Sequence, residues 1–122
     1  MVSQVQDAGL KEFVDAIVAD DVVKYVGWGT GSGQAVTDSD LATAAAESRT
    51  SGTLSAVTTN TTDDTLRCVA QIVATAARAI TEVGQFATAA TATLRMYADF
   101  SVLNLNEDDS ITFTIDTVLN QA

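Results

Sequence analysis

The sequence predicts a mainly β protein: an antiparallel β-sandwich or jelly-roll-like fold with an N-terminal amphipathic helix. Three observations lead to this expectation. One segment near the N-terminus has apolar residues at helical spacing, several later segments alternate apolar and polar residues, and turns rich in Thr, Asn and Asp separate them. With 122 residues, of which 47% are hydrophobic, we expect a single domain, 1–122, with a substantial core.

The helix is predicted over about residues 7–19, with Asp7 as its N-cap. Large apolar side chains recur there at the i, i+3, i+4, i+7 spacing of one helix face. These side chains are Leu10, Phe13, Val14 and Ile17. A stripe of this kind packs against its own core or forms a seam with another subunit. The four residues are therefore candidates for an interface as well as for core packing.

The segments that follow the helix alternate between strand-like and loop-like composition. Val22–Val26 is rich in β-branched and aromatic residues and predicts a strand. Residues 27–40 predict a loop, because glycines alternate there and are followed by Asp, Ser and Thr. The Ala-rich residues 41–48 predict a short helix or an irregular turn. Residues 50–59 predict an exposed strand, with a turn over Asn60–Asp64.

Residues 66–80 fit both a buried helix and a buried strand. Their alanines favour a helix, yet apolar residues also fall on one face at period two. That face comprises Leu66, Cys68, Ala70, Ile72 and Ala74. We favour strands over 66–74 and 79–86, with the helical alternative left open.

The C-terminal third gives the clearest β pattern. Residues 93–100 have Leu94 and alternate residues after it on one face, which predicts a strand. In Ser110–Val118, Ile111, Phe113 and Ile115 alternate with polar residues, as in a half-buried antiparallel strand. Residues 104–109, which end in three consecutive acidic residues, predict the turn between these two strands.

The charge balance excludes one large class of partners. Sixteen acidic residues against six basic ones give a net charge of −10. Such a field repels phosphate backbones, so we expect no nucleic-acid binding. The acidity fits general solubility and also a halophilic protein, because salt screens the self-repulsion of a carboxylate-rich surface.

The composition also argues against enzymatic chemistry. The chain has no His, which removes the commonest general base and the imidazole metal ligands. Its single cysteine, Cys68, lies in an apolar run and predicts a buried small residue. No apolar stretch approaches the ~20 residues of a membrane span, and the N-terminus does not resemble a signal peptide. We therefore expect no enzyme, no cofactor and no membrane association.

A run of alternating glycines at Gly27, Gly29, Gly31 and Gly33 resembles a phosphate-binding loop at first sight. Its spacing does not fit the G-x-G-x-x-G motif, and no lysine follows it as a P-loop requires. We expect instead a loop whose glycines allow close backbone approach or positive φ. Trp28, between two of these glycines, is a candidate either for an interface contact or for a core position.

Three acidic clusters offer oxygen ligands of the kind that Ca²⁺ prefers. They lie at Asp38/Asp40, at Asp63/Asp64 and in residues 104–109. The last cluster does not follow the EF-hand pattern, and solvated turns are the favoured interpretation. A small Ca²⁺-binding or carbohydrate-binding module remains the alternative from a different functional class.

The order of these segments resembles that of small structural proteins from tailed phages and archaeal tailed viruses. The sequence differs from the pattern of this group at two positions: Gln85, where an apolar residue is usual, and Asp108, where Gly or Lys is usual. The matching segments are Tyr25–Gly31, Thr37–Leu41, the pair Glu47 and Arg49, Ala79–Phe86, Thr93–Ala98 and Asp109–Thr114.

This resemblance implies a non-enzymatic virion subunit, made in the host cytoplasm and assembled into the virion. A capsid decoration (cement) protein on the capsid surface is the first expectation, and a tail or head-fibre attachment component is the alternative. The implied partners are the major capsid protein or other virion subunits, with a homo-oligomer such as a trimer as the working form.

Overall fold

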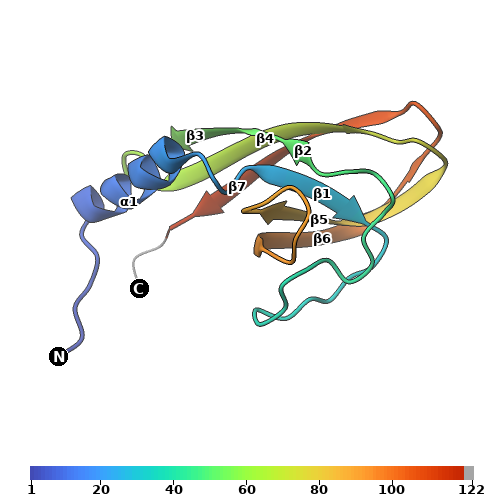
Figure 1. The fold of residues 1–122 in the computed structure, drawn as a ribbon. Helices are drawn as coiled ribbons and strands as arrows, with labels where there is room; N and C mark the ends of the chain where they lie inside the picture. Colours follow the sequence, from blue (N-terminus) through green and yellow to red (C-terminus); the bar gives the residue numbers. More distant parts are fainter. Residues whose placement is uncertain (120–122) are drawn as a thin grey trace.

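One helix and seven strands make up the described part of the chain, residues 1–119 of this computed structural model (Figure 1). The helix precedes all of the strands, and the strands follow one another with short connections except for a long loop between β1 and β2. The elements are α1 (Asp7–Asp20), β1 (Tyr25–Gly29), β2 (Thr50–Ser51), β3 (Thr53–Val57), β4 (Thr65–Val73), β5 (Arg78–Phe86), β6 (Leu94–Leu105) and β7 (Ser110–Val118).

The strands form two antiparallel sheets that pack face to face, which confirms the predicted mainly β, sandwich-like fold with an N-terminal helix. One sheet has the order β2-β1-β5-β6 and the other has the order β3-β4-β7. All strand pairs are antiparallel. The consecutive strands β6 and β7 belong to different sheets, so the turn between them links the two sheets.

The core lies between the two sheets and is built from alternate residues of their strands. The predicted period-two face of β4 is buried, which confirms a strand in place of the helical alternative for this segment. Trp28 of β1 meets Phe113 of β7 edge-on, with ring centroids 6.3 Å apart, so this contact joins the two sheets. The buried core residues of the sandwich are Val26, Trp28, Leu54, Leu66, Cys68, Ala70, Ile72, Ala74, Ile80 and Val83.

The helix covers one end of the three-stranded sheet. Leu10 and Val14 are buried, and α1 contacts β3 and β4. The helix ends where Asp21 adopts a left-handed conformation (φ 56°) and its N–H bonds to the carbonyl of Ile17. The observed bounds extend the predicted helix by one residue, and the predicted N-cap is wrong: Asp7 is the first helical residue, and Gln6 holds the N-cap position without a side-chain capping hydrogen bond. Within residues 1–119, no helix has the length and hydrophobicity needed to span a membrane.

The predicted strand boundaries change at β1 and β6, and one open alternative is settled. The first strand is Tyr25–Gly29 and not Val22–Val26, because Gly27 and Gly29 pair with β5 and continue the ladder. Strand β6 runs on to Leu105, which shortens the acidic turn predicted over 104–109. Residues 41–48 form an irregular segment with one isolated bridge, between Gly29 and Ala44, so the irregular-turn alternative is confirmed.

Candidate interaction surface

Of the four alternating glycines, Gly27 and Gly29 lie on the outer face of the four-stranded sheet, and Gly31 and Gly33 lie in the β1–β2 loop. Gly27 is opposite Gly84, and Gly29 is opposite Glu82, in the β1–β5 ladder. A Cβ atom on Gly29 would overlap the carboxylate of Glu82 and the carbonyl oxygen of Thr43. The glycines therefore allow the long β1–β2 loop to lie directly on the sheet, which is the close-approach role expected of them.

Glu82 fastens this loop to the sheet. Its side chain is fully buried and accepts hydrogen bonds from the backbone N–H groups of Ala42 (3.2 Å) and Thr43 (2.9 Å). The hydroxyl of Tyr97 on β6 donates a third hydrogen bond at 2.9 Å. Burial, together with the hydrogen bond to Glu82, raises the pKa of Tyr97 to about 12. One carboxylate thus joins β5, β6 and the loop.

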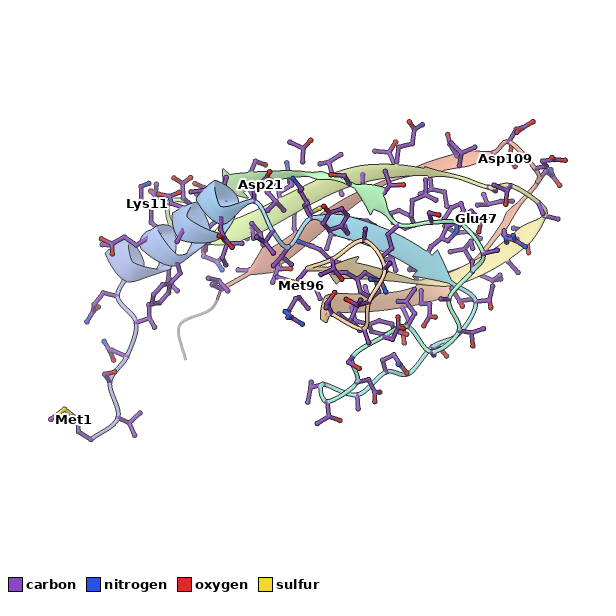
Figure 2. All side chains as sticks on the ribbon, in the orientation of Figure 1. Met1, Lys11, Asp21, Glu47, Met96 and Asp109 are labelled. Carbon is purple, nitrogen blue, oxygen red and sulfur yellow. The ribbon has the colours of Figure 1, made fainter. Side chains whose placement is uncertain are left out.

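Glu47 fastens the far end of the same loop. Its carboxylate accepts hydrogen bonds from the indole Nε1 of Trp28 (3.0 Å), the backbone N–H of Thr75 (3.0 Å) and Nε of Arg78 (2.9 Å). Burial opposes ionisation of this group, but these hydrogen bonds outweigh burial and lower its pKa to about 2. Figure 2 shows Glu47 on the loop beside the end of β1.

Arg49 packs over the same sheet face. Its guanidinium carbon lies 3.4 Å from the ring centroid of Phe86, a stacked cation–π contact. Its Nη1 donates to the backbone carbonyls of Thr88 (3.1 Å) and Thr91 (2.6 Å). Glu47 and Arg49 are neighbours in the segment pattern, yet each bonds to different partners, because Glu47 pairs with Arg78 and Arg49 pairs with Asp40.

The acidic turns use their carboxylates to bind their own backbone. Asp38 accepts from the N–H of Ala35, and Asp109 accepts from the N–H of Asn106. Asp64 accepts from three consecutive N–H groups, those of residues 59–61, and these hydrogen bonds lower its pKa to about 2. Across residues 1–119, no group of three or more potential metal-ligating side chains lies together. These carboxylates stabilise turns.

The predicted interface residues fall into two groups. Leu10, Val14 and Trp28 are buried, at 4%, 0% and 1% exposure, so the structure places them in the core and not at the surface. Ile17 is partly buried against the core, whereas the ring of Phe13 is 54% exposed. Phe13 therefore stays a candidate contact residue on the outside of the helix.

A second apolar surface, which the sequence did not indicate, lies at the open side of the sandwich. Strands β6 and β7 are the last strands of their respective sheets, and a groove of about 440 Å³ runs between them. Its lining includes Phe100, Leu103, Ile111, Phe113 and Ile115. The alternation in β7 predicted a half-buried face. Only the assignment of β6 and β7 to different sheets turns that face into a groove.

The fold and these contacts define the molecule as a small antiparallel β-sandwich whose buried carboxylates anchor loops and turns. No protein-family model matches the chain, and neither a curated protein nor a solved structure shows significant similarity to it.

Proposed function

We propose that this protein is a non-enzymatic virion structural subunit, a capsid decoration protein that binds the assembled head of a tailed virus and stabilises it. The proposal rests on the order of the sequence segments described above and on the hydrogen bonding of the buried carboxylates. The observation that carries it is that Glu47, Glu82 and Asp64 are each saturated by hydrogen-bond donors of the protein itself.

Saturated carboxylates of this kind are poorly suited to catalysis or cation binding. A general acid or base needs a lone pair or proton directed at a substrate, and a Ca²⁺ ligand needs oxygens directed at the ion. Glu82 directs its oxygens at the loop and at Tyr97, and Glu47 directs its oxygens at Trp28, Thr75 and Arg78. The function therefore lies in the surfaces that the sandwich presents.

A decoration protein acts by linkage. A subunit that binds the assembled shell but not the separated capsid proteins stabilises the shell. The stabilising free energy grows with the ratio of the free subunit concentration to its Kd. A rigid sandwich suits this role, because binding then costs little conformational entropy in the subunit. The long β1–β2 loop, held at Ala42 and Thr43 by Glu82 and near its C-terminal end by Glu47, is part of that surface.

The test compares virions with and without this protein. Virions stripped of it, or assembled without it, are expected to lose their DNA at lower temperature and after milder osmotic shock, and adding the purified protein back should restore resistance. A quantitative gel separates the decoration role from the tail or head-fibre alternative, since decoration needs many copies per virion and attachment needs few. Unchanged resistance together with absence of the protein from purified virions would refute both roles.

A further inference from the structure

The chain begins with an extended arm that precedes the helix. Among the described residues, residues 1–5 make no hydrogen bond, and Val2 is 99% exposed. Val5 is 39% exposed and lies beside Gly9. Figure 2 shows Met1 at the tip of this arm, pointing away from the sandwich. The arm, defined as residues 1–6, has no charged side chain in a protein of net charge −10.

The outer edge of β6 is the second feature without a partner inside the described chain. Strand β6 pairs with β5 on one side only, and β7 pairs with β4 on one side only. The segment Phe100–Leu105 has the sequence FSVLNL, without charge, Pro or Gly, and Val102 and Leu103 are 52% and 43% exposed. Edge strands are normally protected by charges, proline or covering segments. The segment Phe100–Leu105 carries no such charge or proline and borders the apolar groove, whereas the charged residues of β6, Arg95 and Asp99, precede it.

We propose that the β6 edge and the adjoining groove bind the arm of a second copy of this chain. The arm adds to β6 as a short strand along Phe100–Leu105, and its backbone groups pair with those of the edge. Alternate side chains of a strand point to one face, so either Val2 or the pair Met1 and Val5 lies over the groove. Six extended residues span about 20 Å, which is enough to cover this segment.

The charge distribution favours the arm of a second copy as the segment that binds the β6 edge. Two copies of a chain with net charge −10 repel each other, and they associate most readily where neither partner brings an unpaired charge. The side chains of the arm and of the segment Phe100–Leu105 are all uncharged, and the N-terminal ammonium group of Met1 is positive, opposite in sign to the acidic partner. Asp116, which lines the groove, already forms two hydrogen bonds of 2.8 Å with Arg67. The contact therefore joins segments of two acidic molecules that have no acidic side chain of their own.

The stoichiometry also favours this contact. Each copy has one arm and one β6 edge, so a head-to-tail arrangement uses every arm and every edge. Such a heterologous contact closes into a ring when the rotation between copies allows it. The contact between the arm and the β6 edge holds together the homo-oligomer on which the proposed function rests. Its test needs only purified protein, so it can fail while the role in the virion stands.

Cross-linking between two single-cysteine variants tests the contact directly. One preparation carries Val2→Cys and the other carries Leu103→Cys; the two are mixed and oxidised. The native Cys68 is buried, and burial raises the pKa of its thiol to about 11, so it stays out of the reaction. We expect a disulfide-linked dimer from the mixture. Val36→Cys replaces Leu103→Cys in the control, because Val36 is fully exposed on the long loop, and it should give no such dimer.

Light scattering of three further variants gives a second, independent result. Deletion of residues 2–5 and the substitution Val102→Lys should each convert the oligomer into monomer, whereas Val36→Lys should leave it assembled. Circular dichroism should show all three variants folded, because the altered residues are exposed. A monomeric parent protein, or an oligomer that survives the deletion, would overturn the proposal. Dissociation by Val102→Lys alone would show that β6 edges pair with each other and that the arm is not the occupant.

Discussion

The indole Nε1 of Trp28 donates a 3.0 Å hydrogen bond to the carboxylate of Glu47, 19 residues along the chain. This bond joins the largest buried side chain of the sandwich to the end of the long β1–β2 loop. The same carboxylate also accepts from Arg78 at the start of β5. Core packing and loop position are therefore coupled through one acidic residue, which gives the first prediction.

Glu47→Gln should destabilise the fold by about 2–4 kcal/mol, because it removes the negative charge from a buried network that includes Arg78. Urea unfolding measures the change, and Trp28 is the reporter because it is the single tryptophan. Its emission in the folded variant should also shift as the indole loses its charged acceptor. Glu107→Gln, on the exposed β6–β7 turn, is the matched control and should change stability by less than about 0.5 kcal/mol.

The stability of the parent protein should fall as the pH is lowered from about 4.5 to about 2. The pKa of Glu47 is lowered in the folded state from its usual value of 4.5 to about 2, so the folded state binds this proton less readily than the unfolded chain. The stabilisation is complete above pH 4.5 and is lost as the pH approaches 2. Asp64, with its pKa lowered from 3.8 to about 2, acts in the same direction.

Melting curves collected from pH 6 to pH 2 provide the measurement, and Glu47→Gln should show a shallower fall than the parent over this range. Equal slopes for the two proteins would contradict the assignment of Glu47 as a major contributor to acid sensitivity.

Gly29→Ala should destabilise the fold by about 1–3 kcal/mol or prevent the loop from docking, because its Cβ would overlap the carboxylate of Glu82 and the backbone of Thr43. Thermal melting gives the loss of stability, and limited proteolysis reports release of the β1–β2 loop. Ser32→Ala, at an exposed position on the same loop, is the control. A fully stable Gly29→Ala protein would show that the close approach is not needed.

Arg49→Lys should cost about 1–2 kcal/mol although it keeps the charge. Lysine cannot stack a planar group on Phe86 while it donates to the carbonyls of Thr88 and Thr91. Chemical denaturation of Arg49→Lys and of Arg95→Lys, whose parent side chain is exposed on β6, separates this effect from the general Arg-to-Lys change. Similar small losses for both variants would argue against a specific role of the stack.

Molar salt should raise the melting temperature by roughly 5 °C. The net charge of −10 on 122 residues produces self-repulsion that salt screens. Comparison of sodium chloride with an uncharged osmolyte at matched osmolality separates screening from general exclusion effects. A melting temperature that does not change with salt would count against the halophilic interpretation of the acidity.

The strand pattern of β4 and β7 was predictable, because residues that alternate between core and solvent leave a period-two signal in the sequence itself. The helix was predictable for the equivalent reason at a period of 3.6 residues. The extent of β1 was not, since glycine has a low strand propensity and local statistics end a strand there. Gly27 and Gly29 stay in the strand because β5 pairs with them and the loop covers them.

The roles of single polar residues were the least predictable part. Gln85 is fully buried, and its Nε2 donates to the carbonyl of Val23 at 2.7 Å. Its partner is 62 residues away in sequence. A contact at that separation leaves no local pattern, so neither composition nor spacing could have indicated it.

Periodicity, composition and charge thus specified the class of fold, the core faces of β4 and β7 and the acidic character of the chain, because these properties are set by residues close together in the chain. Tertiary structure decided that Trp28 belongs to the core, that Glu47 and Glu82 anchor a loop, and that β6 and β7 border an open groove. Each of these depends on groups brought together from distant segments, and their burial and hydrogen bonding exist only once the two sheets have packed.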